Sequence, residues 1–419
     1  MEDWAGWLLA LFNFSIVLMW KHVRSDRKVV QAIWFCIILH HAVAFLNAYV
    51  GTVVGAEADA ASFHFRGAAL ATLPVPEWTN GTGMVIYTQF LGSFYRAFGT
   101  SLFFGGELSV LAFTLSCVVL VKLVYLLDLG RFRIGIVLLF GLLPSAVIFR
   151  SVTLRESWQA LFFLLSIYWV VRLRKRPGIL IFTFMFMLIS AFSMALLHNG
   201  LRVYAMYLIL TGIYWGIFSR KKDFRWARHV RFLFVGLLFA CVIILIQKIG
   251  WYLTVGEALE KVENFRKLAV TIDSRTSYGV ILDTSSVLGL VKTIPMIFAQ
   301  YMFAPFPWQV GNVKDIHVLL ESMLRFVLLF FAVYSWRRSS AEVRSHYSFL
   351  LIVVLGIELM WALGTLNWGT AIRHHVPGYS VIVLLGAPGL ILFMQRLHFR
   401  MFGRGKVSCE KNEQARHMS

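Results

Sequence analysis

The stretch VQAIWFCIILHHAVAFLNAYVGT, residues 30–52, decides the fold class of this chain. It runs for 23 residues without an Asp, Glu, Lys or Arg. A helix of about 20 apolar residues is long enough to cross the roughly 30 Å hydrocarbon core of a bilayer. Because backbone N–H and C=O groups in lipid must bond within their own segment or a closed barrel, the stretch predicts a transmembrane helix.

Similar stretches recur along all 419 residues, of which 59% are hydrophobic and 15% charged. An average soluble domain is about 25% charged, so a soluble core could not use this much apolar surface. We predict eleven transmembrane helices, over residues 4–20, 30–52, 107–127, 134–149, 157–172, 179–197, 201–219, 232–252, 316–336, 347–365 and 377–395. The sequence therefore predicts an all-α multi-pass membrane protein, with one membrane domain over 1–403 and a disordered polar tail over 404–419.

The basic residues predict the orientation. Clusters of Lys and Arg follow every second span, for example Lys21–Lys28, Arg131–Arg133 and Arg337–Arg344, and such clusters stay in the cytoplasm. The N-terminus then lies outside and the C-terminus inside. The net charge of +19 is interpreted as this topological signal and as attraction to anionic membrane lipids, and no nucleic-acid partner is expected.

Two long segments fall on the outer side, over residues 53–106 and 253–315. Within the first, Met84–Phe104 is amphipathic, which is typical of a helix in the membrane interface. Within the second, Val287–Phe303 is apolar, but treating it as a span would place Arg337–Arg344 outside. We therefore predict an interfacial or re-entrant helix there, bent at Pro295.

The first outer segment carries the residues with the clearest catalytic chemistry. The run EADAASFHFR contains Glu57, Asp59, His64 and Arg66. A carboxylate with an imidazole is the minimum set for activating a sugar hydroxyl by general base catalysis. Asp59, Glu57 and His64 are therefore catalytic candidates and Arg66 a substrate-binding one, although a solvated loop would have the same composition. No cofactor is expected, but Glu57 and Asp59 could ligate a divalent metal ion.

Arginines and a histidine mark the outer ends of later spans. Arg150, Arg155 and Glu156 lie at the start of the fifth predicted span, and His198 and Arg202 lie in the turn after the sixth. The planar guanidinium fork matches the oxygens of a diphosphate. Interface residues that reach toward water, or residues that cap a turn, would explain the same positions.

The ninth span has two further features. Trp308, in the proline-containing run Tyr301–Trp308 before it, is either a stacking platform for a sugar or an aromatic anchor in the interface. His317, Glu321 and Arg325 follow at four-residue spacing. Residues at this spacing share one helix face, so we expect contact between them, with Glu358 of the tenth span as an alternative partner for Arg325.

The last outer segment, between the tenth and eleventh spans, is the most specific. It reads NWGTAIRHHVP over residues 367–377, with Arg373, His374 and His375 in succession. One cation and two imidazoles beside a Gly-Thr turn predict a compact anion site that could neutralise a leaving diphosphate.

Four of these motifs together resemble bacterial multi-spanning polysaccharide polymerases, which include O-antigen and exopolysaccharide polymerases and are related to type C membrane glycosyltransferases. The motifs are Asp59 with Phe63-His64 and Ala68, Leu154-Arg155-Glu156, Pro305-Phe306-Pro307-Trp308, and Gly369-Thr370-Ala371-Ile372-Arg373-His374-His375 with Pro377. The resemblance extends over residues 55–380 and implies a protein of the bacterial inner membrane.

What the resemblance implies is transfer of a glycan from an undecaprenyl-diphosphate carrier to an acceptor sugar at the periplasmic face. A first-loop carboxylate acting as base maps onto Asp59, with Glu57 as its rival. Diphosphate binding maps onto Arg155 and Arg373, with His374 beside the latter. Where relatives have Arg-His-Arg, this chain has His375 in the third place, so its diphosphate site is expected to differ in strength or shape.

Three alternatives stay open. A ligase or single-sugar transferase would use the same donor, and only acceptor choice separates it from a polymerase. A transporter or flippase of lipid-linked glycans would carry its polar groups near mid-membrane, often in broken helices related by a repeat. A non-catalytic subunit that works with other polysaccharide assembly proteins would tolerate loss of Asp59 or Arg373.

Overall fold

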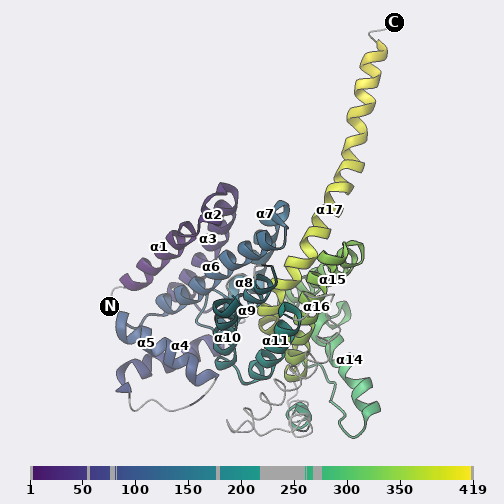
Figure 1. Cartoon of the computed structure of the whole chain (residues 1–419). Coiled ribbons are helices and arrows are strands. Elements are labelled where there is room, and N and C mark those ends of the chain that lie inside the picture. Colours follow the sequence, from purple (N-terminus) through teal and green to yellow (C-terminus); the bar gives the residue numbers. More distant parts are fainter. Residues whose placement is uncertain are drawn as a thin grey trace.

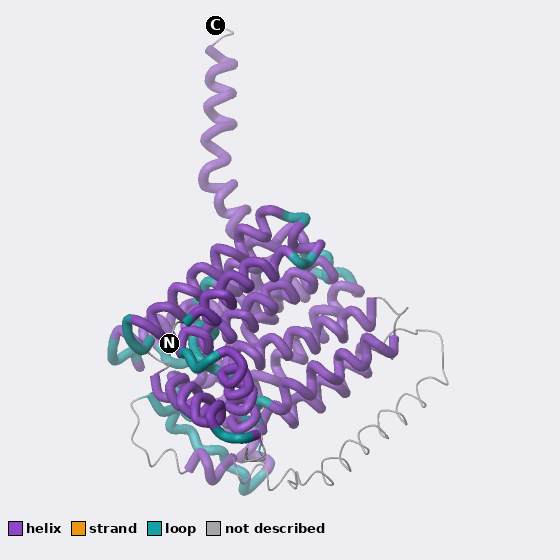
Figure 2. Tube along the Cα trace, turned by 90° about the vertical axis from the view of Figure 1, so that its left-hand side faces the viewer, coloured by secondary structure: helices purple, strands orange, loops and turns teal. Residues whose placement is uncertain are grey.

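The structure is a computed structural model that describes residues 3–53, 57–75, 81, 83–175, 180–217, 260, 262–267 and 276–416. These residues form helices and connecting loops, and no strand occurs among them (Figure 2). The helices are α1 (Trp4–Leu18), α2 (Lys21–Arg24), α3 (Arg27–Tyr49), α4 (Glu57–Thr72), α5 (Met84–Phe98), α6 (Leu102–Leu126), η2 (Gly130–Phe132), α7 (Arg133–Gly141), α8 (Pro144–Phe149), α9 (Glu156–Lys175), α10 (Leu180–Leu196), α11 (Asn199–Ile217), α14 (Val287–Phe303), η5 (Pro307–Gln309), α15 (Val313–Arg338), α16 (Ala341–Gly364) and α17 (Trp368–Arg416).

The prediction of an all-α membrane protein is confirmed. Five helices of the described chain are long and apolar enough to cross a membrane: α3, α6, α15, α16 and the Trp368–Arg400 part of α17. Shorter apolar helices are α1, Ile181–Leu196 of α10, and α14. The count of eleven spans and the orientation stay predictions, and the span over 232–252 lies outside the described residues.

Figure 1 shows how the two ends of the bundle differ. Helices α4 and α5 lie at the lower end and α14 lies at the lower right, whereas α2 and the C-terminal part of α17 lie at the upper end. The lower end therefore carries the segments that the charge pattern assigns to the outer face. The polar residues from 404 continue α17 away from the body (Figure 1). The disordered tail over 404–419 stays a prediction.

Proline and capping residues move three predicted boundaries. The predicted span 134–149 is interrupted between α7 and α8, because Pro144 supplies no N–H and disfavours a helical residue before it. The amphipathic run ends at Phe98, where Gly99 has a φ of 94°. The Ser101 hydroxyl then accepts from Phe104 N at 3.1 Å and starts α6 at Leu102, ahead of the predicted start at 107.

The segment 367–377 is not a loop, as the sequence analysis predicts, but the first turns of α17. The Asn367 side chain accepts a hydrogen bond from Thr370 N at 2.8 Å, which is the N-cap arrangement. The chain just before the helix is also fixed, since Tyr278 N donates to Leu366 O at 2.9 Å. Arg373, His374 and His375 therefore project from a rigid helix.

Close packing fixes the position of α17. A Cβ added at Gly386 would lie 2.2 Å from the Leu328 carbonyl oxygen of α15, and one at Gly389 would lie 2.7 Å from the Ser335 hydroxyl. Small residues of this kind let two helices approach closely within a membrane. Arg266, from the segment over residues 253–315, donates to the carbonyls of Ala362, Leu363 and Thr365 and so caps the C-terminus of α16.

Candidate functional site

Asp59 of α4 and Arg373 of α17 form an ion pair across 314 residues of sequence. The Asp59 side chain is 52% exposed and the Arg373 side chain 15% exposed. Within the described part of the chain, Arg373 is the one hydrogen-bond partner of Asp59. The structure thus joins the predicted base and the predicted diphosphate-binding residue, and it leaves the carboxylate open to solvent.

Helix α4 is held against α5, which fixes the position of Asp59. Tyr95 of α5 lies 2.8 Å from the Nδ1 of His64. Arg96 donates through Nε to Ala71 O at 3.2 Å and through Nη2 to Leu70 O at 3.4 Å, at the C-terminus of α4. Cations at that end of a helix satisfy its last carbonyls and its dipole.

His374 lies beside the ion pair in a group of three rings. Its ring stacks on Trp361 of α16, with centroids 4.0 Å apart and planes at 19°. The ring of His198 also contacts Trp361, with centroids 4.7 Å apart. The Thr365 hydroxyl donates to Trp361 O at 2.7 Å, so it accepts from the Nδ1 of His374, also at 2.7 Å. These contacts fix the ring and the tautomer of His374.

His198 is neutral in this setting. Burial, and secondarily the charge of Arg155, lowers its pKa to about 3. Its Nδ1 accepts from Gly200 N at 3.1 Å, so Nε2 carries the proton. His198 can therefore donate a hydrogen bond to a substrate oxygen at neutral pH but cannot add a positive charge.

Arg155 lies where α4, α5 and the α10–α11 turn meet. Its Nη1 donates to Leu197 O at 3.2 Å, and its guanidinium lies 5.7 Å from the ring centroid of Phe63 in α4. Gly83, with a φ of 63°, is a neighbour of both Arg155 and His198: a Cβ there would lie 3.7 Å from Arg155 Nη1 and 3.6 Å from His198 Cα. Arg155, His198, His374 and Arg373 thus gather near one end of the bundle.

Two other predicted arginines lie deeper. Arg150 is 1% exposed and donates through Nη2 to Val376 O at 2.8 Å; Arg325 is 3% exposed and donates through Nη1 to Met302 O at 2.5 Å. The predicted contact of Arg325 with Glu321 is wrong, since Glu321 accepts from the N–H and hydroxyl of Ser145 at 2.7 and 2.6 Å. Each guanidinium therefore joins two helices, while Nε and Nη1 of Arg150 and Nε of Arg325 have no hydrogen-bond partner among the described residues.

Glu358 is not the partner of Arg325 either. It lies 2.6 Å from the Nδ1 of His375, in a buried pair. His375 therefore points into the bundle rather than toward Asp59, because successive residues on a helix are rotated by about 100°. His317 is half-buried on α15.

The other predicted residues differ in their contacts and burial. Arg66 donates to the sulfur of Met84 at 2.8 Å, and burial lowers the pKa of His64. Trp308 is 79% exposed and stacks on Phe306, with centroids 5.0 Å apart. Glu156 is buried at the start of α9, and Arg202 is half-buried in the first turn of α11. The side chain of Glu57 lies outside the described residues.

Trp361 and Thr365 are site residues that the sequence analysis misses. Their four-residue spacing at the end of α16 was the one signal, and it does not distinguish a site from a helix end. Among the described residues, no three His, Cys, Asp or Glu side chains are grouped so that they could hold a metal ion. Comparison with protein-family models, with curated proteins and with solved structures finds no match.

Proposed function

We propose that this protein transfers a glycan from a polyprenyl-diphosphate donor to a sugar hydroxyl at the outer face of the bacterial inner membrane. The observation that carries the proposal is the Asp59–Arg373 pair, with Arg155, His198 and His374 near it. A carboxylate for the proton and guanidinium groups for the diphosphate are the two functions this reaction needs. A lipid-linked donor, once flipped, is presented at that face.

In the proposed reaction, Asp59 takes the proton of the acceptor hydroxyl while the acceptor oxygen bonds to the anomeric carbon. The bond from that carbon to the diphosphate oxygen breaks, and the diphosphate leaves with the electron pair. Arg373 and Arg155 offset the charge that develops on it, and the N–H of His198 donates a hydrogen bond. No cofactor enters this sequence of bond changes.

Arg373 has to change partner during such a reaction. A diphosphate carries more negative charge than one carboxylate, so it competes with Asp59 for the guanidinium. An exposed ion pair of this kind stabilises the protein by only about 0–1 kcal/mol, so the exchange costs little. Donor binding would then release Asp59 as a free base.

The transport alternative draws on the buried charges Arg150, Arg325 and Glu358. Charged groups inside a bundle commonly mark a transport path. Here Arg150 and Arg325 each donate to a backbone carbonyl of a neighbouring helix, and Glu358 is paired with His375. Contacts of this kind favour a packing role, so we rank transport second.

The test is the lipid-linked glycan profile of cells that lack the protein, complemented with wild type, Arg373→Ala, Arg373→Lys or Asp128→Asn. Asp128 is a matched control, because it is an exposed Asp with a single cation partner, Lys175, far from the candidate site. We expect single repeat units to accumulate on the outer leaflet with Arg373→Ala, partial recovery with Arg373→Lys, and a normal profile with Asp128→Asn.

Other outcomes have definite meanings. Units trapped on the inner leaflet would establish a flippase instead. Polymer of normal length on an altered acceptor would indicate a ligase. An unchanged profile in cells without the protein would overturn the proposal as a whole.

A further inference from the structure

His375 lies between a carboxylate and a carbonyl in the interior of the bundle. Its Nδ1 is 2.6 Å from Glu358 Oε2 of α16, and its Nε2 is 3.1 Å from the carbonyl oxygen of Tyr301 in α14. The side chains of His375 and Glu358 are 4% and 2% exposed. One side chain of α17 thus bonds to both neighbouring helices.

These contacts fix the number of protons on the pair. A carbonyl oxygen only accepts, so the Nε2 of His375 must carry a hydrogen. At Nδ1, either the ring donates to an ionised Glu358 or a protonated Glu358 donates to the ring. In both forms the pair holds one proton more than an ionised Glu beside a neutral His. Without that proton, one of the two contacts would place the lone pair of a ring nitrogen against the lone pair of an oxygen.

The C-terminus of α14 favours the same arrangement. The last carbonyls of a helix lack partners within it and carry the negative end of its dipole. Here Tyr301 O accepts from His375, and Met302 O accepts from the Nη1 of Arg325 at 2.5 Å. A protonated imidazole and a guanidinium are suitable groups to cap this helix end.

We infer that Glu358 and His375 form a proton-holding pair that joins α14, α16 and α17 and thereby positions Arg373, two residues before His375, for the donor diphosphate. The positioning step rests on the proposed function; the proton-holding step does not. Arg325 of α15, Tyr204 of α11, Tyr301 of α14 and His374 of α17 also face the pair within electrostatic range.

Gly378 shows that the carboxylate position depends on its surroundings. A Cβ added at Gly378 would lie 1.9 Å from Glu358 Oε1. Alanine is the better helix former, but its methyl group would displace the carboxylate from His375. Gly378→Ala therefore disturbs the pair without changing a titratable group.

The chain contains a natural control. His41 of α3 lies 2.7 Å from Glu107 of α6, which also accepts from Asn13 at 3.0 Å. The Nε2 of His41 has no hydrogen-bond partner among the described residues. A neutral His41 with its hydrogen on Nδ1 satisfies the Glu107 contact, so this pair needs no extra proton.

The first experiment measures thermal unfolding of the purified full-length protein in lipid nanodiscs between pH 5.5 and 8.5. In the unfolded chain, Glu and His titrate near pKa values of about 4.3 and 6.5. The inferred arrangement requires the folded pair to keep its proton above pH 6.5, where the unfolded chain has lost it, so the inference predicts that stability falls as pH rises. The unfolding constant should increase about tenfold per pH unit until the folded pair itself deprotonates.

The variant Glu358→Gln/His375→Gln keeps hydrogen-bonding groups of similar reach and removes both titrating groups, so it should lose this component of the pH dependence. Glu107→Gln/His41→Gln should keep the wild-type dependence. A wild-type slope in the first double variant would overturn the inference. If that variant does not fold, Gly378→Ala decides: a lower melting temperature at pH 6.5 with a shallower slope supports the pair, and wild-type behaviour overturns it.

The second experiment tests positioning by the KM for the diphosphate donor. We expect Gly378→Ala to raise this KM at least tenfold with a smaller change in kcat per folded protein, whereas a simple loss of folded protein leaves KM unchanged. An unchanged KM would remove the positioning role and leave the proposed function intact. No donor turnover by wild type would instead refute the proposed function, and the pH-dependent unfolding would still decide the proton-holding step.

Discussion

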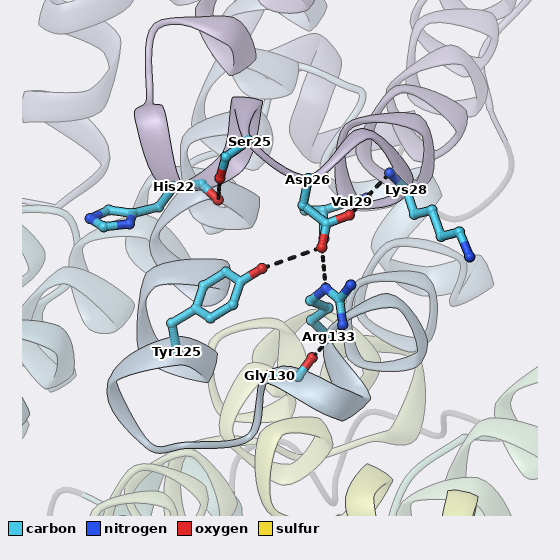
Figure 3. A network of polar contacts seen from close by, with 8 residues as sticks. All are labelled: His22, Ser25, Asp26, Lys28, Val29, Tyr125, Gly130 and Arg133. Atoms are coloured by element: carbon cyan, nitrogen blue, oxygen red, sulfur yellow. Dashed lines mark hydrogen bonds and ion pairs between the residues drawn. The ribbon is translucent and has the colours of Figure 1, made fainter.

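Two Asp–Arg pairs at different places in the molecule have the same chemistry and opposite surroundings. Asp26 caps α3 and accepts from Lys28 N at 3.1 Å, from Val29 N at 3.3 Å, from the Tyr125 hydroxyl at 3.4 Å and from Arg133 (Figure 3). Its side chain is 16% exposed. Asp59 is 52% exposed and has Arg373 as its partner within the described residues. Folding uses all the bonding capacity of the first carboxylate, and leaves most of the second available.

The cations differ in the opposite sense in exposure, 28% for Arg133 and 15% for Arg373, and they also differ in their further bonds. Arg133 lies seven residues after Leu126 and is also bound to Gly130 O at 2.8 Å (Figure 3), so its position is set locally. Arg373 is brought to Asp59 only by the packing of α17. Both pairs join segments far apart in the sequence, by 107 and 314 residues. The comparison teaches that a carboxylate with several further bonds stabilises a helix end, whereas a carboxylate with a single contact keeps the capacity to bind another partner.

The largest effect is expected from breaking the Asp59–Arg373 pair. Asp59→Asn keeps size and hydrogen bonding but cannot take a proton, so donor turnover should fall by about 100- to 10,000-fold. The melting temperature should stay at the wild-type value. Turnover and melting would be measured on the same purified samples, with Asp128→Asn as control. Wild-type turnover in Asp59→Asn would remove Asp59 as the base.

The next largest effect is expected from breaking the Asp26–Arg133 pair. Asp26→Ala removes an N-cap, which costs about 0.5–2 kcal/mol of stability, while turnover per folded molecule should not change.

Burial alone would raise the pKa of Asp26, but the bonds from Arg133 and the Val29 and Lys28 amides lower it below its usual value. The stability that ionised Asp26 contributes is therefore present above pH 4 and lost as pH falls through its lower folded pKa. A melting difference between Asp26→Asn and wild type that does not shrink on acidification would contradict this.

A smaller effect is expected on stability when the Asp59–Arg373 pair is broken. Arg373→Gln should change the free energy of unfolding by less than about 1 kcal/mol, because exposed ion pairs are weak. Chemical or thermal unfolding at low and high salt would measure this. A loss of unfolding free energy as large as that of Asp26→Ala would show that the Asp59–Arg373 pair is structural. The contrast between the two pairs would then fail.

The smallest expected effect concerns pH. With a pKa of about 3, His198 stays neutral between pH 5 and 8, so it should add no inflection to the pH profile of turnover in that range. His198→Gln should slow turnover by loss of a donor but keep the shape of the profile. A profile whose inflection disappears in this variant would show that His198 titrates.

Hydropathy predicted the fold class because length and apolarity alone decide whether a segment can cross a bilayer. It misplaced boundaries at Leu102 and Trp368, where single capping side chains start the helices earlier than the hydrophobic pattern does. Composition also singled out Asp59 and Arg373. Their pairing could not be predicted, since nothing local to either residue specifies a partner 314 positions away.

The interior was harder to predict. Four-residue spacing showed that Glu321 and Arg325 share a face of α15, but spacing gives direction along one helix and not the identity of the facing helix. In the structure, Glu321 accepts from Ser145 and Arg325 donates to the Met302 carbonyl, so the two side chains bind different helices. The Glu107–His41 and Glu358–His375 pairs were missed for the same reason, because each joins two helices.

The three successive contacts of Arg373, His374 and His375 also restrict how α17 can move. The three side chains leave the helix about 100° apart and meet Asp59, Trp361 and Glu358 respectively. A roll of α17 about its own axis by one residue would break all three contacts together. Tilt or sliding of the axis distorts them gradually instead. These three contacts therefore favour a fixed rotational register for the first turns of α17, and they oppose rotation of the helix more than its tilt or translation.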